Sequence, residues 1–239
     1  LLAGGTSRVY FESLPLLRSI ALILCRMGFW TLRREHLDGR KGLLILLGGI
    51  FGLAALYVVP LPSVVWQNMP GREQVSSIDQ MVGLGNMWRS VAIAPSEGVN
   101  ALFSLVLPMA VIIVGIQLRR KDVRRLLLVI IAIGALSGII SVMQIISNSD
   151  SALYFYKITN NGSAVGFFAN RNHAAAFLAC LFPILAVYAS SAGGAAEYQN
   201  RRQYVAIALA IILVPLLLVI GSRSGLLLSL LGLAGATLI

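Results

Sequence analysis

The chain has 239 residues, of which 58% are hydrophobic and only 12% are charged, and its mean hydropathy is +0.85. A water-soluble domain carries about 25% charged residues, so this composition excludes that class and predicts a membrane protein. In another chain, a net charge of +10 would suggest that the protein binds nucleic acid. Here the basic residues stand in short segments between apolar runs and form no stripe with aromatic side chains, so no nucleic-acid partner is expected.

Apolar runs of about 17 to 25 residues are long enough to cross a bilayer as helices. The sequence predicts six complete spans near residues 14–32, 42–60, 101–118, 126–146, 174–192 and 204–221, and a seventh from about 224. The predicted fold class is therefore all-α, a polytopic transmembrane helix bundle, in a single domain over residues 1–239. Both ends of the chain lie in apolar sequence, so we expect both to be truncations of a longer bundle.

The distribution of basic residues orients the predicted bundle. Eleven of them lie in short segments on one side: Arg33, Arg34, Arg40, Lys41, Arg119, Arg120, Lys121, Arg124, Arg125, Arg201 and Arg202. Six lie on the other side, in longer segments that also contain acids: Arg8, Arg72, Arg89, Lys157, Arg171 and Arg223. Because short cytoplasmic loops are enriched in Lys and Arg, the first side is predicted to be cytoplasmic and the second exterior.

Two basic residues lie inside the first span. An Arg at the centre of a bilayer costs about 2.5 to 3.5 kcal/mol on insertion scales, and Arg18 is close enough to the end of the span to reach the interface. Arg26 is deeper, so we expect it to have a partner inside the bundle, for structure or for function. Cys25 and Cys180 also fall in apolar runs and are interpreted as small packing residues.

The two long exterior segments are residues 61–100 and 147–172. In the first, Ser76–Ile93 has apolar residues at helical spacing, which fits either a short amphipathic helix on the outer leaflet or an ordinary loop. In the second, Tyr154, Phe155 and Tyr156 fit either a sugar-binding face or an interfacial aromatic belt. The sequence does not decide between these interpretations.

The most informative stretch is Gly166–Ala176, in which four consecutive polar residues introduce an apolar span. These are Asn170, Arg171, Asn172 and His173. A span that begins in this way sets amide, guanidinium and imidazole groups at the membrane surface, where they suit oxygen-rich or anionic ligands. We predict a binding site there, in which His173 positions a ligand, bonds the helix start or acts as a base.

A second arginine joins this site. Arg223 follows Ser222 in the turn before the seventh span, so Arg171 and Arg223 both lie at exterior helix N-termini, which attract anions. Guanidinium groups add paired donors suited to phosphate. The predicted ligand is a lipid-linked pyrophosphate, bound by Arg223, Arg171 and Ser222. The alternative is that each Arg extends to lipid headgroups.

Other chemistries lack the residues that they need. Glu97 and Asp150 are isolated in loops, so an acid and base pair of carboxylates is not expected. No His, Cys or Asp cluster has metal-ligand spacing, so no metal site is predicted.

Four motifs in order resemble the O-antigen ligase and O-antigen polymerase superfamily of bacterial envelope glycosyltransferases. The motifs are Pro60–Pro62 with Trp66–Arg72, Trp88–Glu97, Gly166–His173 with Pro183, and Ser222–Gly225. The last two are the most specific, and the resemblance covers most of the chain.

The resemblance implies a GT-C type glycosyltransferase of the bacterial inner membrane that acts at the periplasmic face without metal, cofactor or nucleotide sugar. Its donor would be a glycan on undecaprenyl pyrophosphate, and its acceptor lipid A core or a growing glycan. In the family an arginine of the Ser-Arg motif binds the donor pyrophosphate, and Arg223 stands at that position. The resemblance further implies that a catalytic arginine and histidine come from a large exterior loop, expected beyond Ile239. Ligase and polymerase are not distinguished.

A transporter or flippase for a lipid-linked or anionic solute is the alternative. Such proteins carry ionisable residues near mid-bilayer and broken helices in matching halves. Pro108, Pro183 and Pro215 could kink helices, but apart from Arg26 the middles of the spans are uncharged, which favours the enzyme.

Overall fold

The computed structural model describes residue 5 and residues 13–191 and 196–238. Helices hold 71% of the chain, as expected for an all-α protein. Arg8, the first residues of the chain, Ala192 at the end of the fifth predicted span, and Ile239 lie outside the described residues.

Within the described ranges, six helices are long and apolar enough to cross a membrane, which indicates a multi-pass membrane protein. They are Leu14–Thr31, Lys41–Val58, Pro95–Gly115, Arg120–Ile146, Arg171–Ser190 and Glu197–Ile220. A shorter apolar helix, Arg223–Ala236, follows. Each predicted span coincides with one of these helices, although several helices begin earlier than predicted.

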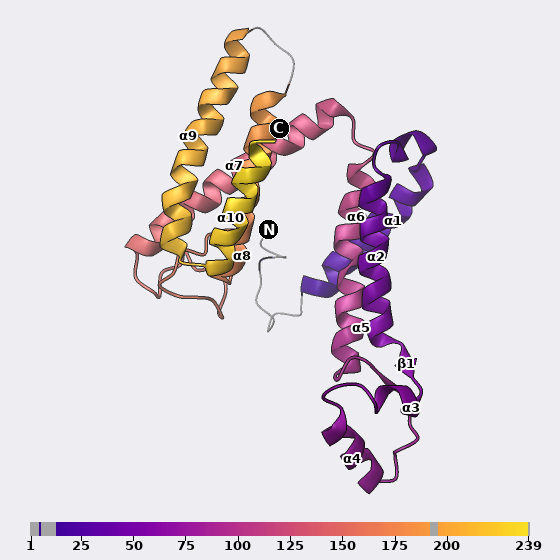
Figure 1. Ribbon diagram of the computed structural model, residues 1–239. Helices are drawn as coiled ribbons and strands as arrows, with labels where there is room; N and C mark the ends of the chain where they lie inside the picture. Colours follow the sequence, from indigo (N-terminus) through magenta and orange to yellow (C-terminus); the bar gives the residue numbers. More distant parts are fainter. Residues whose placement is uncertain (1–4, 6–12, 192–195, 239) are drawn as a thin grey trace. The chain divides into compact units, whose positions relative to one another are not determined.

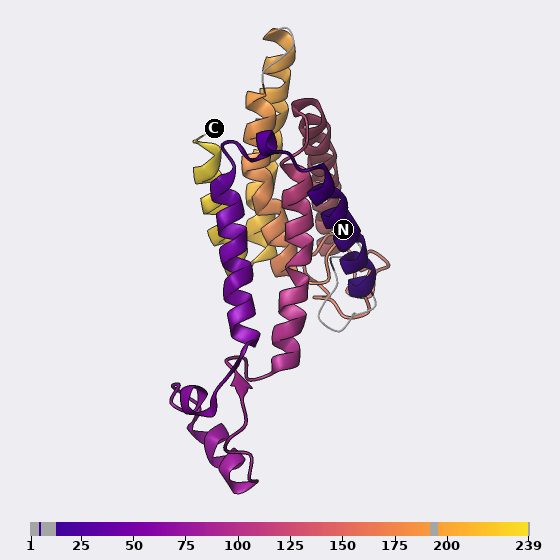
Figure 2. The same ribbon diagram turned by 90° about the vertical axis from the view of Figure 1, so that its right-hand side faces the viewer.

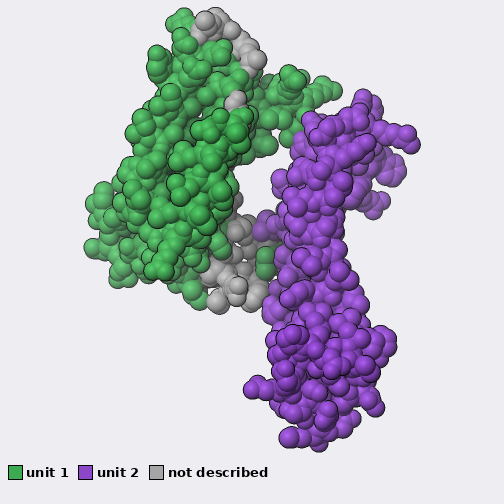
Figure 3. Space-filling model, in the orientation of Figure 1, with its two compact units in different colours: residues 1–15, 118–239 green, residues 16–117 purple. Residues whose placement is uncertain are grey.

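The chain divides into two compact units, residues 16–117 and residues 1–15 with 118–239 (Figure 3). The prediction of a single transmembrane domain is not tested by this division and stays a prediction.

The C-terminal unit contains four helices: α7 (Arg120–Ile146), α8 (Arg171–Ser190), α9 (Ala196–Ile220) and α10 (Arg223–Ala236) (Figure 1). Its core is apolar and lies mainly between α8 and α9, with Leu178, Leu181, Leu213 and Leu217 among the buried residues. Helix α8 makes its most extensive contacts with α10. The two helices run in the same direction, as Figure 1 shows.

The other unit contains α1 (Ser13–Thr31), the 3-10 helix η1 (Arg34–Leu37), α2 (Lys41–Val58), α5 (Pro95–Ser104) and α6 (Val106–Gly115). Helices α5 and α6 together form one span that runs beside α2 (Figure 2). The break between them falls after Ser104, because Pro108 has no N–H to donate to the carbonyl of that residue. Pro95 occupies the first turn of α5, where proline is favoured.

A small subdomain connects α2 to α5. It consists of β1 (Pro60–Leu61), α3 (Ser63–Trp66), α4 (Glu73–Met81) and β2 (Arg89–Ser90), with β1 and β2 antiparallel. The segment Ser76–Ile93, for which the sequence left a short helix and a loop open, is helical only as far as Met81, and Gly83 follows in the left-handed region with φ of 76°.

Trp66 is the centre of this subdomain and is fully buried, although tryptophan is typical of the membrane–water interface. Its Nε1 donates to the carbonyl oxygen of Met87 at 2.9 Å, and the guanidinium of Arg89 lies 5.8 Å from its ring centre. Arg89 also pairs with buried Asp79, with an Nη2 to Oδ1 distance of 2.6 Å, and this hydrogen bond raises the pKa of Arg89. Buried Arg72 donates to the carbonyls of Ser90 and Val91. Arg72 and Arg89 therefore stabilise the fold of this subdomain.

Candidate anion-binding site at the starts of α8 and α10

The start of α8 is capped by its own chain. Asn170 is the N-cap, and its Oδ1 accepts from the backbone N–H of Asn172 at 2.8 Å. The N–H of Arg171 donates to Oδ1 of Asn160 at 3.0 Å, and the N–H of His173 donates to the carbonyl of Asn170 at 3.1 Å. The first N–H groups of α8 are therefore occupied, and an anion here would be bound by side chains.

The start of α10 differs. Buried Ser222 is the N-cap and accepts from the N–H of Gly225 at 3.0 Å. Among the described residues, nothing accepts a hydrogen bond from the backbone N–H groups of Arg223 and Ser224. Unsatisfied N–H groups at a helix start bind anions, so α10 is the stronger of the two anion-binding ends.

The two helix starts lie side by side. A Cβ atom placed on Gly225 would be 2.3 Å from Cβ of Ala175, and one placed on Gly232 would be 2.8 Å from the carbonyl oxygen of Ala179. Both contact positions advance along α8 and α10 together, which shows that the helices are parallel. Small residues at helix contacts permit such approach in membranes. The ends that carry Arg171 and Arg223 are consequently at the same end of the unit.

Most of the side chains predicted for the site are exposed to solvent in the structure. Arg171, Asn172, His173 and Arg223 are exposed, Asn170 is half-buried, and Ser222 is 2% exposed. No described residue accepts a hydrogen bond from the guanidinium of Arg171 or Arg223. Both cations are thus available at one surface, while Ser222 and Asn170 act as helix caps.

The segment of residues 147–170, which the charge distribution predicts to be exterior, is fixed to α7 by Gln144, a residue that sequence reasoning missed. Gln144 is fully buried, and its Oε1 accepts from the N–H groups of Val165 at 2.9 Å and Gly166 at 2.7 Å. Its Nε2 donates to the carbonyls of Leu153 at 2.8 Å and Gly166 at 3.1 Å. One amide therefore holds two parts of the segment that leads into Arg171.

The aromatic residues of this segment fold back onto it. The hydroxyl of Tyr154 accepts from the N–H of Gly162 at 3.0 Å, and that of Tyr156 donates to the carbonyl of Phe167 at 2.9 Å. Burial raises the pKa of Tyr156, so this phenol stays protonated at neutral pH. Phe155 stacks on Phe167 with ring centres 5.9 Å apart. These contacts give the aromatic side chains a structural role within the segment.

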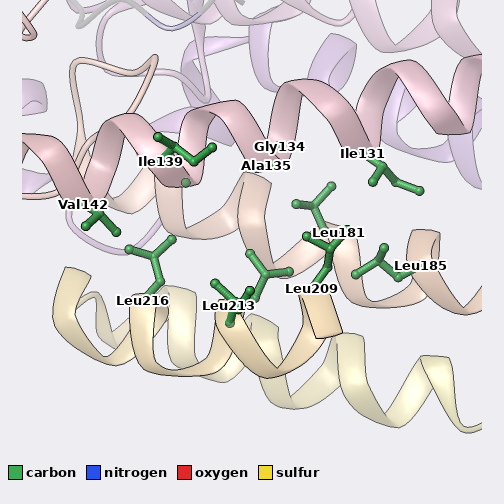
Figure 4. Close-up of a pocket in the computed structure, with 12 residues that line it drawn as sticks. Ile131, Gly134, Ala135, Ile139, Val142, Leu181, Leu185, Leu209, Leu213 and Leu216 are labelled. Carbon is green, nitrogen blue, oxygen red and sulfur yellow. The ribbon is translucent and has the colours of Figure 1, made fainter. Parts of the chain in front are cut away.

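An apolar pocket of about 210 Å³ lies between α7, α8 and α9 (Figure 4). It extends from Val142 and Leu216, near the C-terminal ends of α7 and α9, to Ile131 and Leu185, nearer the middle or the opposite end of their helices. Its lining is entirely aliphatic, with Gly134 among the residues on α7. The pocket suits a hydrocarbon chain and offers no polar partner to a headgroup.

In the other unit, Arg26 was expected to have a partner inside the bundle. The structure instead gives partners to Arg18, on the same helix. Nη2 of Arg18 donates to Oδ1 of Asn100 at 2.6 Å, to the carbonyl of Asn100 at 3.0 Å and to Oγ of Ser104 at 2.7 Å. Arg26 is exposed on α1, and no described residue bonds its side chain. One turn separates Asn100 from Ser104 on α5, which places both acceptors on one face.

In the described part of the chain, no three His, Cys, Asp or Glu side chains gather closely enough to hold a metal ion. Comparisons of the sequence and structure with family models, with curated proteins and with solved structures found no match in any of the three. The family assignment therefore remains a resemblance carried by the motifs.

Proposed function

We propose that the protein is a membrane glycosyltransferase of the GT-C type that transfers a glycan from undecaprenyl pyrophosphate to an acceptor hydroxyl. The observation that carries the proposal is the pairing of two cationic helix starts, at Arg171 and Arg223, at one end of the C-terminal unit. The guanidinium groups of Arg171 and Arg223 and two N–H groups of α10 have no partner among the described residues, and such donors suit the charge of a pyrophosphate. The motif resemblance supplies the reaction.

In the proposed reaction the acceptor oxygen attacks the anomeric carbon while the bond from that carbon to the pyrophosphate oxygen breaks. The leaving pyrophosphate gains negative charge, which Arg223, Arg171 and the α10 N-terminus stabilise. The acceptor hydroxyl gives its proton to a base, and we assign no base among the described residues. The aliphatic pocket between α7, α8 and α9 is suited to the isoprenoid tail of such a donor, because it excludes polar groups.

Substitution of Arg223 in the full-length protein tests the proposal. Arg223→Ala should lower transfer from purified undecaprenyl-pyrophosphate glycan about tenfold to a hundredfold, because a charge-assisted hydrogen bond contributes about 1.5 to 3 kcal/mol. Arg223→Lys should also be impaired, because an ammonium does not reproduce the planar pair of donors. Rates are measured after reconstitution and normalised to membrane level.

Arg120→Lys is the matched control, since Arg120 is exposed and begins α7 at the opposite end of the unit. It should leave transfer unchanged. If Arg223→Lys transfers glycan as fast as the parent, Arg223 only extends to headgroups and the pyrophosphate site is wrong.

A transporter of lipid-linked solutes is the second candidate, and the polar network of Arg18, Asn100 and Ser104 favours it. An ionisable group held inside a span by neutral acceptors is typical of a solute pathway. The same reconstitution separates the two functions. A glycan that crosses the bilayer still attached to its lipid, with no transfer product, would support transport.

A further inference from the structure

A second concave site lies at the opposite end of the C-terminal unit, where α7 and α9 begin and α8 ends. This hollow has a volume of about 510 Å³, and its charged lining residues are Arg124 on α7 and Arg201 and Arg202 on α9. Tyr188 on α8 and Tyr198 on α9 complete its polar lining. Three helices therefore contribute to one basic hollow, on the side that the charge distribution predicts to be cytoplasmic.

Along the helices, the lining changes from charged to apolar side chains, in the same order as the headgroup and acyl chains of a phospholipid. Arg124 and Leu128 are one turn apart on α7, and Arg202 is followed by Val205 nearly one turn later on α9. The basic groups are thus nearer the helix ends, and the aliphatic side chains are farther along each helix. Tyrosine is favoured at the level of the headgroups.

The described residues that line the hollow are basic, aromatic or aliphatic, and none of them is a carboxylate. The Nε of Arg202 donates to the carbonyl of Tyr198 at 3.3 Å, which orders this side chain at the wall. Guanidinium groups bind phosphate oxygens with paired donors, and basic pockets between membrane helices bind anionic headgroups.

We propose that this hollow binds the phosphate of an anionic glycerophospholipid, with the tyrosines at the glycerol level and the acyl chains along Leu128 and Val205. The site is separate from the proposed donor site, which lies at the starts of α8 and α10. It does not depend on the glycosyltransferase assignment.

The test measures lipids retained by the purified full-length protein in nanodiscs of mixed phosphatidylglycerol and phosphatidylcholine, by native mass spectrometry. The parent should retain phosphatidylglycerol in preference to phosphatidylcholine. Its affinity should fall about fivefold for each arginine removed, since one basic residue contributes about a fivefold factor near an anionic surface. The triple substitution Arg124→Gln, Arg201→Gln and Arg202→Gln should therefore abolish the preference.

The matched control is Arg119→Gln, Arg120→Gln and Arg125→Gln, which removes the same charge from the start of the same unit but from side chains outside the hollow. The control should keep the preference within about twofold of the parent, because its charges are exposed to solvent screening. Equal losses in both triple variants would show general surface attraction and overturn the site. If the triple variant does not accumulate, Arg201→Gln against Arg125→Gln gives the same comparison.

A soluble phosphate ligand is distinguished by competition. Inorganic phosphate should displace the retained lipid no better than sodium chloride of equal ionic strength. Specific displacement by phosphate would overturn the assignment to a lipid, and retention of both lipids in equal amounts would do the same.

Discussion

Gln144 connects α7 to the segment of residues 147–170, which leads into the candidate site. Its amide makes four hydrogen bonds to backbone groups of residues 153, 165 and 166. Because this side chain is fully buried, its loss would leave several backbone groups without partners, at about 1 to 3 kcal/mol for each unsatisfied group.

We predict that Gln144→Leu loosens the exterior segment. Tryptic cleavage after exposed Lys157 should become at least about tenfold faster, in line with the loss of more than 1.4 kcal/mol. The measurement is limited proteolysis of the detergent-solubilised protein, followed by mass spectrometry of the fragments. Gln203→Leu is the control, since Gln203 is exposed on α9 and no described residue bonds its side chain. Unchanged cleavage in Gln144→Leu would mean that the amide does not hold the segment.

The sequence predicted the polar residues at the candidate site but not the residue that positions the preceding segment. Asn170, Arg171 and His173 are recognisable because polar residues at the start of an apolar span are unusual. Gln144 lies near the end of a span among apolar residues, where a single amide is compatible with a lipid-facing or a buried position. Its partners are backbone groups about ten and twenty residues later, and backbone groups leave no signal in the sequence.

The helix ends could not be predicted from the apolar runs either. Helix α7 begins at Arg120 and α9 at Ala196, both well before the predicted apolar spans. Apolar runs report the hydrocarbon core, whereas Arg, Lys, Gln and Glu are also good helix formers and continue the helix beyond it. At 27 residues, α7 is about 40 Å long and exceeds a core of about 30 Å.

The parallel pair of α8 and α10 brings the two arginines to one end, and the pair depends on glycine. We predict that Gly225→Ala lowers the unfolding temperature and glycan transfer, because the new Cβ would lie 2.3 Å from that of Ala175 and the helices must separate. Gly235→Ala on the same helix is the control. Nothing lies within 4 Å of a Cβ at that position, so this change should be neutral or stabilising by up to about 1 kcal/mol.

Thermal unfolding in detergent and transfer in proteoliposomes check the Gly225 prediction. A Gly225→Ala protein as stable and active as Gly235→Ala would show that the close approach of α8 and α10 is not required.

For the whole molecule, the charge distribution predicts which side each segment faces. In a protein with Cys25→Ala and Cys180→Ala, a single cysteine at position 157 should react with a membrane-impermeant maleimide in intact cells. A cysteine at position 121 should react only after permeabilisation. The reason is that basic residues of short loops stay in the cytoplasm. External labelling at position 121 would reverse the orientation and remove the basis for an exterior pyrophosphate site.

The segment 147–170 packs closely against α7 at Gly166, and this contact restricts which side chains can occupy the positions that form it. Gly166 has a φ of 55°, and a Cβ atom there would lie 2.3 Å from Oγ of Ser137 and 3.0 Å from Oγ of Ser141. Both serines are fully buried, and Ser141 Oγ has no hydrogen-bond partner among the described residues. The three residues share one small volume, so enlarging any of them displaces the other two. Their mutational effects are therefore coupled, although residues 137 and 166 are far apart in the chain, and a tolerated change at one position constrains the choices at the other two.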